Sequence, residues 1–501
     1  MGSRSEGSHA GRGSPCPAAS RDAEPPDVMQ EPRPQWPPAF LERMQALLGD
    51  EFGAFLEALA SRRARGLRLN PRKVGRDELA RLLGLEMKPV PWCPTGFLVE
   101  GGPGLGSHPA HLAGLFYLQD PSAMSVVEVL DPQPDWKVVD LAAAPGGKTT
   151  HLVSRLGADG LVFANEVIGH RLRPLHENLD RCGSSGVVTA GVELDHLASL
   201  APGFFDAALL DAPCSGEALL RRDRAVASQW SPAVVAGSAR RQRHLLARAT
   251  ELVRPGGTLV YSTCTFEVEE DEEQVATVLR EHPDWELAEI ARRPGFDPGV
   301  PLPPWPTERA VRLWPHRVSG DGQFVARLLR RDGGAAGGPH PGPSPLRGGS
   351  AERRRRPWPT DFQAERLVLD QWKTFQAQTA PGFQLDSGRL LARGPYLFHL
   401  PASAEGVSTV PLARPGTLLG MSRPAHFRPS HGLACLLDPG LVSSSVSWPE
   451  GDERLRAFLR GETVESPGAD GWVLVCYERW GVSWGRRTGG VIKNFLPHHL
   501  R

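Results

Sequence analysis

Short apolar runs and helical patterns alternate through the middle of the chain. Apolar runs that end in a polar or turn residue occupy residues 138–140, 161–166, 187–189, 205–210 and 258–262. Between them, helical patterns cover residues 149–156, 171–182 and 233–253. Alternating strands and helices are typical of an open, doubly wound and mostly parallel sheet with helices on both faces. We therefore predict an α/β fold for the central part of the chain.

The pattern changes on both sides of this central part. Towards the N-terminus, helical spacing over residues 40–59 is followed by a short strand at 66–71 and a helix at 79–85. This order predicts a small α/β module. Towards the C-terminus, a helix at about 362–375 precedes short apolar runs that are separated by Gly and Pro turns. This second pattern predicts a β-rich unit.

Composition accounts for the stretches that lack such a pattern. Residues 1–37 are rich in Gly, Ser, Pro and charge, which predicts a disordered tail. A Gly- and Pro-rich stretch that ends in four arginines predicts a flexible linker at 332–357. A chain of 501 residues is too long for one core, so several domains are expected. We divide it into a tail 1–37, an N-terminal module 38–115, a central domain 116–331, a linker 332–357, a first C-terminal segment 358–428 and a last unit 429–501.

The charge balance and the cysteines narrow the function classes. Lys plus Arg and Asp plus Glu each total 57, so any nucleic-acid surface must be a local patch. The seven cysteines form no CxxC pair, so neither a disulfide framework nor a zinc site is indicated, and we expect no bound metal. No stretch has the apolar length of a membrane span or the core of a signal peptide, so we expect a cytoplasmic protein without a membrane partner.

Two groups of basic residues are candidates for a local patch. Five arginines gather in the N-terminal module: Arg62, Arg63, Arg65, Arg68 and Arg72. A second group makes the C-terminal end basic: Arg486, Arg487, Lys493, His498, His499 and Arg501. The first group is either a solvated face or a contact with an RNA backbone, and the sequence leaves both alternatives open. The histidines of the second group are predicted to face the surface or RNA. The two adjacent histidines have no metal-ligand partners at useful spacing.

Residues 138–149 have the pattern of a ligand-binding turn. A β-branched strand runs through small residues and two glycines, Gly146 and Gly147, into a helix. Glycines allow close backbone approach and a helix start offers unpaired N–H groups, so a ligand with a carboxylate or phosphate is expected there. One alternative is a phosphate-binding P-loop, in which Lys148 meets phosphates and Thr149 a magnesium ion. The other is a loop that cradles the methionine part of S-adenosylmethionine.

The next strand favours the second alternative. Glu166 ends this strand about 20 residues after the loop, where doubly wound folds bind ribose hydroxyls. A P-loop enzyme has no need of a carboxylate at this place. The order of strand, loop, helix, strand and acid therefore indicates a methyltransferase more than an ATP-binding protein.

Two cysteines and an aspartate follow the last two strands of the alternating pattern. Residues 205–210 lead into Asp211 and Cys214, and residues 258–262 lead into Cys264. Side chains just beyond the carboxyl ends of parallel strands face the ligand crevice, so we predict that these three side chains converge. The other cysteines are predicted to be small buried residues: Cys16, Cys93, Cys182, Cys435 and Cys476.

The motifs of this central part resemble those of the Sun/Nop family of RNA 5-methylcytosine methyltransferases. The similar residues are 140–149, 165–166, 211–217 and 261–266. Residues 428–434 and 490–497 also resemble the C-terminal PUA-like domain of the branch that modifies bacterial small-subunit ribosomal RNA. The likeness is close over about 40–330 and looser over 358–501. It implies a Rossmann-like class I methyltransferase fold and a β-rich, PUA-like RNA-binding domain at 429–501.

The resemblance implies a role for each residue of the predicted crevice. Carbon 5 of cytosine is a poor nucleophile, so the ring must be activated by addition at carbon 6, which a thiolate can do. By the family's pattern, Cys264 is this nucleophile and Asp211 hydrogen-bonds the cytosine ring. Cys214 would assist loss of the carbon 5 proton and release of Cys264. Lys148 either closes the crevice electrostatically or forms a structural salt bridge.

The family's S-adenosylmethionine site carries over unevenly. Its loop corresponds to Ala142, Ala143, Ala144, Pro145, Gly146, Gly147 and Lys148. Ala142 stands where a cysteine is common, a change that is expected to matter little because backbone groups do the binding. Glu166 matches the ribose-binding acid, and Asp211 also borders the cofactor. On the adenine side we select Glu193 by spacing, with Asp195 as the alternative.

We therefore predict an S-adenosylmethionine-dependent enzyme that methylates carbon 5 of cytosine in RNA. The expected partner of the monomeric protein is the small ribosomal subunit or its 16S ribosomal RNA, and transfer RNA is the alternative substrate. A P-loop ATP-binding protein and a non-catalytic ribosome-assembly binder are alternatives from other classes. The joint presence of Cys264, Cys214 and Asp211 counts against the binder, since a retired site has no reason to hold all three.

Overall fold

The structure is a computed structural model of the chain. It describes residues 36–61, 65–101, 104–221, 224–332 and 362–500. Most of the predicted tail 1–37 and of the predicted linker 332–357, including the four arginines, lies outside the described residues. The same holds for Cys16, Arg62, Arg63, Arg501 and the side chain of His499.

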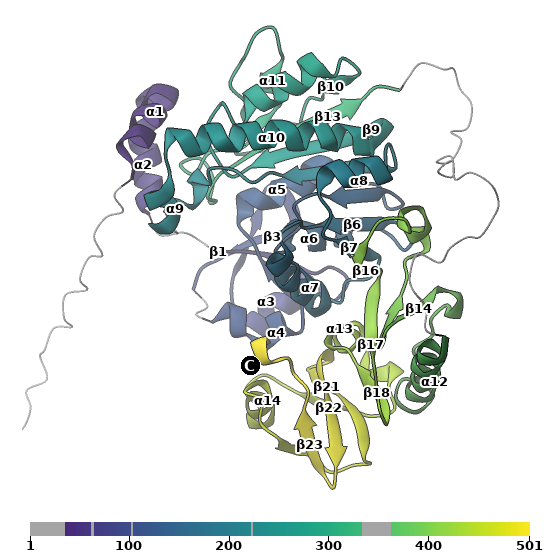
Figure 1. Cartoon of the computed structure of the whole chain (residues 1–501). Helices are drawn as coiled ribbons and strands as arrows, with labels where there is room; N and C mark the ends of the chain where they lie inside the picture. The colour runs from purple at the N-terminus through teal and green to yellow at the C-terminus, as the bar shows by residue number, and fades with distance from the viewer. Residues whose placement is uncertain (1–35, 62–64, 102–103, 222–223, 333–361, 501) are drawn as a thin grey trace, which may run out of the picture. The chain divides into compact units, whose positions relative to one another are not determined.

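A large sheet forms the centre of the fold (Figure 1). Its five parallel strands lie in the order β7 (Val187–Ala190), β6 (Leu161–Asn165), β5 (Lys137–Asp140), β8 (Phe205–Asp211) and β9 (Val253–Thr263). The chain proceeds outwards from β5 in both directions, so the predicted doubly wound, mostly parallel arrangement is confirmed. The strands coincide with the apolar runs of the sequence, except that β9 begins before residue 258. Val253 already pairs with Phe205, ahead of a register shift.

Antiparallel strands extend this sheet at both edges. Beyond β9 lie β13 (Gln323–Arg330), β12 (Val311–Leu313) and β11 (Asp297–Pro298), and β10 (Trp285–Leu287) also pairs with β13. At the opposite edge, β16 (Leu412–Arg414) pairs with β7. A strand from the predicted first C-terminal segment therefore completes the central sheet.

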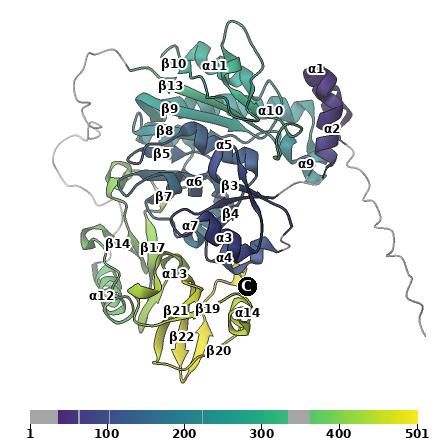
Figure 2. The ribbon, with the colours of Figure 1, turned by 180° about the vertical axis from the view of Figure 1, so that it is seen from behind.

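Helices cover both faces of the large sheet (Figures 1 and 2). One face is covered by α8 (Leu194–Leu200), α10 (Pro232–Leu252) and α11 (Glu272–Glu281), and the other by α5 (Pro121–Leu130), α6 (Gly147–Arg155) and α7 (Leu172–Arg181). Each face has its own buried apolar core, which is why the strands between them read as continuous apolar runs. Within the described part of the chain, every helix is too short or too polar to cross a membrane.

The residues before α5 form two packing units. One is a four-stranded sheet in the order β2 (Met87–Val90), β3 (Cys93–Val99), β1 (Arg65–Leu69) and β4 (Phe116–Leu118), with α3 (Arg76–Leu83) and α4 (Pro109–Leu112). The other is a pair of helices, α1 (Pro38–Leu48) and α2 (Phe52–Ala60). The helical pattern of residues 40–59 is therefore divided into two helices by a break that begins at Gly49. This pair lies beside α9 (Arg224–Gln229), as Figure 1 shows.

The C-terminal part is rich in strands, as predicted. After α12 (Phe362–Thr379), an antiparallel sheet contains β14 (Leu390–Arg393), β15 (Tyr396–His399), β17 (Thr417–Arg423) and β18 (His426–Pro429). After α13 (His431–Leu436), a second sheet has the order β19 (Ser445–Trp448), β21 (Gly471–Tyr477), β22 (Trp480–Thr488), β23 (Val491–Asn494) and β20 (Val464–Glu465), with α14 (Glu453–Leu459) between β19 and β20 in the chain. A shared apolar core joins α12 to both sheets.

Candidate active site

The carboxyl ends of β8 and β9 bring the two selected cysteines together. Asp211 and Ser262 are paired residues of these neighbouring strands, so the loops that follow leave the sheet side by side. The Sγ atoms of Cys214 and Cys264 lie 3.4 Å apart, and both residues are partly exposed. The other cysteines of the described residues are buried. The two selected cysteines therefore lie together at the ends of these strands, while their place in a ligand crevice stays a prediction.

Asp211 is fixed by three side chains in this crevice. Lys148 Nζ lies 2.6 Å from its Oδ2, while Ser262 Oγ and Gln323 Nε2 donate to its Oδ1 at 2.8 and 3.2 Å. Burial lowers the pKa of the Lys148 ammonium, but the charge and hydrogen bond of Asp211, together with the nearby Cys264 and Asp140, hold this pKa above its ordinary value. Lys148 thus forms the salt bridge that the sequence left as one alternative, and its charge also interacts with Cys264.

The hydrogen bond between the two thiols affects the protonation of Cys214. The hydrogen bond with Cys264, followed by burial, raises the pKa of the Cys214 thiol well above its ordinary value. Cys214 therefore stays protonated at neutral pH while Cys264 is its hydrogen-bond partner. This leaves Cys264, which faces the Lys148 charge, as the thiol better placed to act as a nucleophile.

A buried glutamate ties the two cysteine loops together. Glu217 Oε2 accepts a hydrogen bond from the Phe266 backbone N–H at 2.9 Å, and its Oε1 accepts one from Trp230 Nε1 at 2.9 Å. The Ser215 and Thr265 hydroxyl oxygens lie 2.8 Å apart and form a second link between the loops. These links restrict the relative movement of the two thiols.

Helices α1 and α2 support the same loops from outside the sheet. Arg43 forms ion pairs with Glu267 and Glu269, just after the Cys264 loop. The ring of Phe55 stacks edge-on against Phe266 at a centroid distance of 5.3 Å. Sequence reasoning missed these supports, because Arg43 and Glu267 are 224 positions apart and no local pattern connects them.

The turn between β5 and α6 has the geometry of a ligand-binding loop. Gly146 precedes the helix with a φ of +108°, a conformation that glycine adopts without strain. An added Cβ at Gly146 would lie 3.2 Å from the Leu175 side chain. The buried Thr149 hydroxyl donates to Asp140 Oδ2 at 2.7 Å, and burial raises the pKa of Asp140 to about 6. The loop is thereby anchored to the end of β5.

This arrangement does not fit a P-loop. That alternative requires Lys148 and Thr149 to face phosphates and a magnesium ion. In the structure, Lys148 pairs with Asp211 and the Thr149 side chain is fully buried against Asp140. The polar atoms that a nucleotide triphosphate would need are therefore engaged elsewhere.

Glu166 lies where a ribose-binding acid is expected. It follows β6, its Oε1 accepts a hydrogen bond from the Ile168 backbone N–H at 3.0 Å, and Arg171 lies 3.2 Å from its Oε2. This Oε2 is buried and has no hydrogen-bond partner among the described residues. An acceptor with unused capacity fits a ligand that brings hydroxyl donors, as the ribose of S-adenosylmethionine does.

The two acids predicted on the adenine side of the site are both exposed. Glu193 is exposed at the start of α8, and Asp195 lies 3.2 Å from His244 on α10. Asn165, which sequence reasoning did not select, holds the intervening loop: its Nδ2 donates to the Val192 carbonyl and its Oδ1 accepts from the Val192 N–H. Both Glu193 and Asp195 therefore stay candidates.

Comparisons with known proteins place this geometry in a family. Residues 127–329 match the family described as 16S rRNA methyltransferase RsmB/F. Residues 36–121 match the N-terminal domain of 16S rRNA methyltransferase RsmF, and residues 449–501 match the RsmF PUA domain. The ribosomal RNA small subunit methyltransferase F of Erwinia tasmaniensis is 31% identical over 493 residues, which cover 93% of this chain and 96% of the relative.

The chain belongs to the RsmF family. The protein of the same name from Escherichia coli is 32% identical over 491 residues, with the same coverage of both chains. A methyltransferase homolog protein from Pyrococcus horikoshii, solved by crystallography, is 32% identical, with a TM-score of 0.52 over 58% of this chain and 94% of that chain. The predicted family, class I methyltransferase fold and S-adenosylmethionine dependence are confirmed.

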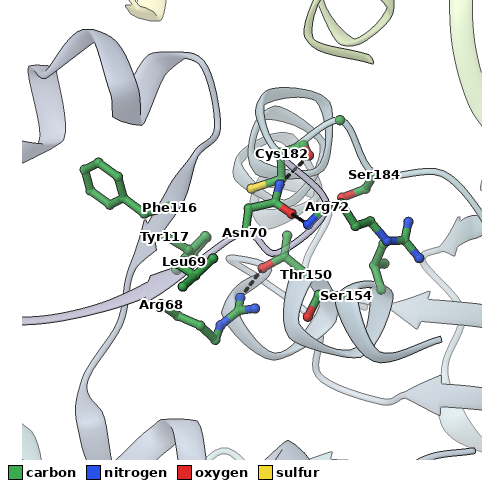
Figure 3. Close-up of a pocket in the computed structure, with 12 residues that line it drawn as sticks. Arg68, Leu69, Asn70, Arg72, Phe116, Tyr117, Thr150, Ser154, Cys182 and Ser184 are labelled. Carbon is green, nitrogen blue, oxygen red and sulfur yellow. Dashed lines mark hydrogen bonds between the residues drawn. The ribbon is translucent and has the colours of Figure 1, made fainter. Parts of the chain in front are cut away.

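One arginine of the RsmF-type N-terminal sheet proves to be internal. Arg68 on β1 is buried and donates to Gln119 Oε1 at 2.9 Å, the Gly147 carbonyl at 3.0 Å and Thr150 Oγ1 at 2.8 Å (Figure 3). The alternative of an RNA-backbone contact is therefore wrong for Arg68. Instead, this arginine fixes the first turn of α6, which follows the predicted cofactor loop.

The surroundings of Arg68 leave no room for a ligand. In Figure 3, Asn70 lies beside Cys182, whose carbonyl accepts a hydrogen bond from Asn70 Nδ2 at 3.0 Å. Arg72 donates to the Leu156 carbonyl at 2.7 Å. The cavity between these residues has a volume of about 20 Å³, enough for a single water molecule. This part of the RsmF-type N-terminal sheet therefore serves packing.

Proposed function

We propose that the protein transfers a methyl group from S-adenosylmethionine to carbon 5 of a cytosine in 16S ribosomal RNA, through a covalent bond between Cys264 and carbon 6. The observation that carries the proposal is the pair of thiol sulfurs 3.4 Å apart, beside a fixed carboxylate, at the ends of neighbouring parallel strands. The relatives' name supports the small ribosomal subunit as the source of the RNA.

The residues of the crevice divide the chemistry between them. S-adenosylmethionine supplies the methyl group on a sulfonium. Cys264 adds through Sγ to carbon 6, and the ring electrons move onto carbon 5, which takes the methyl group. Asp211 holds the ring edge by a hydrogen bond from the base, and Lys148 orients Asp211 through their ion pair.

Cys214 then completes the reaction. Its pKa is raised chiefly by the hydrogen bond with Cys264, and that bond is lost once Cys264 is attached to carbon 6. The Cys214 thiol then releases its proton to solvent, and the resulting thiolate accepts the carbon 5 proton. Departure of that proton restores the double bond and expels Cys264.

The cofactor residues follow from the loop and from Glu166. Backbone groups of residues 142–148 hold the methionine part, and Glu166 Oε2 accepts from the ribose hydroxyls. On the adenine side, Glu193 contacts the base, with Asp195 as the alternative. The proposed domain boundaries are those set out from the sequence, with RNA-binding units at 38–115 and 429–501. The protein works as a cytoplasmic monomer on the small subunit or its free 16S ribosomal RNA.

Labelled methyl transfer followed by bisulfite mapping tests this proposal. The purified protein is incubated with labelled S-adenosylmethionine and 16S ribosomal RNA, intact small subunits or bulk transfer RNA. We expect label in the ribosomal substrates and a bisulfite-resistant cytosine at each labelled position. Label in transfer RNA alone would reassign the substrate, and absence of label from every RNA would favour a non-catalytic ribosome-assembly binder.

A further inference from the structure

A row of polar and aromatic residues crosses one face of the C-terminal sheet. Arg486 on β22 lies directly opposite Trp472 on β21 and Lys493 on β23. Directly opposed residues of neighbouring strands project from the same face of a sheet, so these three side chains are neighbours. Arg486 and Lys493 are exposed and Trp472 is half-buried.

Strand β18 and the residues after β23 widen this row. The guanidinium of Arg428 lies 5.2 Å from the centroid of the Phe495 ring, and that of Arg486 lies 5.9 Å from the Trp472 ring. The Trp472 and Phe495 rings meet edge to face at 4.8 Å, and the His426 ring is 6.2 Å from Trp472. We call these residues the basic strip: His426, Arg428, Trp472, Arg486, Lys493 and Phe495.

The cations of the basic strip have no acidic partners. Among the described residues, Arg428, Arg486 and Lys493 form no ion pair, whereas other exposed arginines of the same part of the chain do: Arg454 with Asp452, Arg456 with Glu453 and Arg460 with Glu462. Burial, followed by the nearby arginines, lowers the pKa of His426, and burial with the charge of Arg423 lowers that of Arg428. Positive charge is therefore concentrated and uncompensated here.

Two grooves flank the aromatic pair. One, of about 660 Å³, is lined by Trp472 and Arg486, and the other, of about 520 Å³, is lined by Arg428, Lys493 and Phe495. Three aspartates border the grooves, and each is engaged: Asp180 with Arg414, Asp370 with Lys373 and Asp470 with the Gly489 backbone N–H. In the described part of the chain, none of these carboxylates forms an ion pair with a cation of the strip.

We propose that the basic strip binds an unpaired strand of the RNA substrate, and this inference rests on the proposed function. Arg428, Arg486 and Lys493 meet phosphates, while bases enter the grooves and stack on Trp472 and Phe495. Uncompensated cations that alternate with accessible aromatic rings are the combination that single-stranded RNA requires. An acidic protein surface would use the charges but would have no need of two stacking faces.

Binding of a single-stranded oligoribonucleotide by the full-length protein, followed by fluorescence anisotropy over a salt series, tests the strip. The double variant R428A/R486A is expected to lose affinity about tenfold and to reduce the slope of log affinity against log salt by about 1.4, since each lost contact removes about 0.7. Trp472→Ala is expected to lower affinity about tenfold without changing this slope. Circular dichroism checks that each variant is folded.

The matched control is the double variant R456A/R460A. It removes two equally charged and exposed arginines from the same part of the chain, both of which already have acidic partners. We expect its affinity and its salt slope to stay within twofold of the unchanged protein. An equal loss in this control would mean that net charge alone governs binding and would overturn the proposal.

Other outcomes separate the strip from the catalytic proposal. If the unchanged protein methylates RNA and R428A/R486A binds and methylates it equally well, the proposed role of the strip is wrong and the proposed function stands. If the variant loses RNA affinity while the unchanged protein transfers no methyl group, the proposed function is wrong and the proposed role of the strip stands. Polyglutamate serves as a second probe: equal losses for polyglutamate and RNA, with Trp472→Ala without effect, would assign the strip to an acidic protein.

Discussion

Two clusters of this protein each combine a thiol, a carboxylate and a basic group, in different settings. The crevice has two thiols, the Asp211 carboxylate and the Lys148 ammonium. The buried cluster, which we define as Cys93, Glu128, His151 and Arg155, has a thiol, a carboxylate, an imidazole and a guanidinium. Its Cys93, Glu128 and His151 place potential metal-ligand atoms within 4.8 Å of one another. Residue type alone would make both clusters candidates for chemistry.

Burial and partner choice distinguish the two clusters. Glu128 shares its Oε1 with His151 at 3.0 Å and Cys93 at 3.5 Å, and its Oε2 with Arg155 at 2.7 Å. Burial raises the pKa of Cys93 to about 11 and lowers that of His151 to about 4. The thiol is thus kept protonated, and the guanidinium already neutralises the carboxylate that a cation would need.

Position on the sheet, more than residue type, therefore decides which of these groups can react. The crevice lies at the carboxyl ends of parallel strands, where side chains reach solvent and a ligand. The buried cluster joins β3, α5 and α6, where its thiol, carboxylate and imidazole are buried and bond to one another, while its Arg155 reaches solvent. The changes below test this contrast, from the largest expected effect to the smallest.

Removing the proposed nucleophile should have the largest effect. Cys264→Ala is expected to lower methyl transfer by about 10³-fold or more, because the ring is no longer activated at carbon 6. Methylation assays with saturating S-adenosylmethionine measure this. Cys93→Ala is the matched control and should stay within twofold, and comparable losses in both variants would contradict the contrast.

Replacing the second thiol of the crevice should stop the reaction half-way. Cys214→Ser is expected to lower turnover about 10²-fold and to leave protein attached to RNA, because the carbon 5 proton is no longer removed efficiently. Denaturing gel electrophoresis detects this complex. The double variant C214S/C264A should form none, and normal turnover by Cys214→Ser without any complex would disprove the two-thiol mechanism.

Two buried glutamates, each paired with an arginine, can be compared for their effect on cofactor binding. Glu166 keeps an oxygen without a hydrogen-bond partner, whereas both oxygens of Glu128 are engaged. Glu166→Ala is expected to raise the KM for S-adenosylmethionine by about 10- to 100-fold, through loss of a charged hydrogen-bond acceptor. Glu128→Ala should leave this KM within twofold, and an equal rise in both variants would remove the ribose assignment.

Disrupting the buried cluster should affect stability rather than activity. Glu128→Ala leaves the buried His151 imidazole without its hydrogen-bond partner and Arg155 with Asp131 alone, so the free energy of unfolding is expected to fall by about 3 kcal/mol. Chemical denaturation measures this change. Cys93→Ala should cost only about 1 kcal/mol, because the thiol makes a weak hydrogen bond. Unchanged stability in both variants would show that the cluster is not a packing element.

The smallest expected effect concerns pH. Burial keeps the pKa of His151 near 4 in the folded protein, below the ordinary 6.5 that it has when unfolded. The unfolded chain therefore binds a proton first, and stability is lost as the pH falls from 6.5 to 4, by about 2 kcal/mol at pH 5. His151→Gln should weaken this acid sensitivity between pH 7 and 5 in thermal melts. An identical pH dependence would exclude His151 as its source.

The sequence predicted the crevice because local rules applied to it. Apolar runs located β8 and β9, and the strand-end rule placed Asp211, Cys214 and Cys264 together. The same rules do not report burial. Arg487 was grouped with the basic C-terminal residues, yet it is buried and donates to Ser444 and Ser466. Burial therefore removes Arg487 from the basic surface, as it does Arg68.

The sequence by itself determined the order of strands and helices, the cofactor turn and the residues at the strand ends, since each depends on spacing within a short stretch. Only the tertiary structure decided which cations stay free. Arg43 and Arg68 are bound to partners from distant segments, while Arg428, Arg486 and Lys493 meet across strands and form no ion pair with any described residue. Side-chain partners are set by which strands and helices pack together, and a linear pattern does not contain that information.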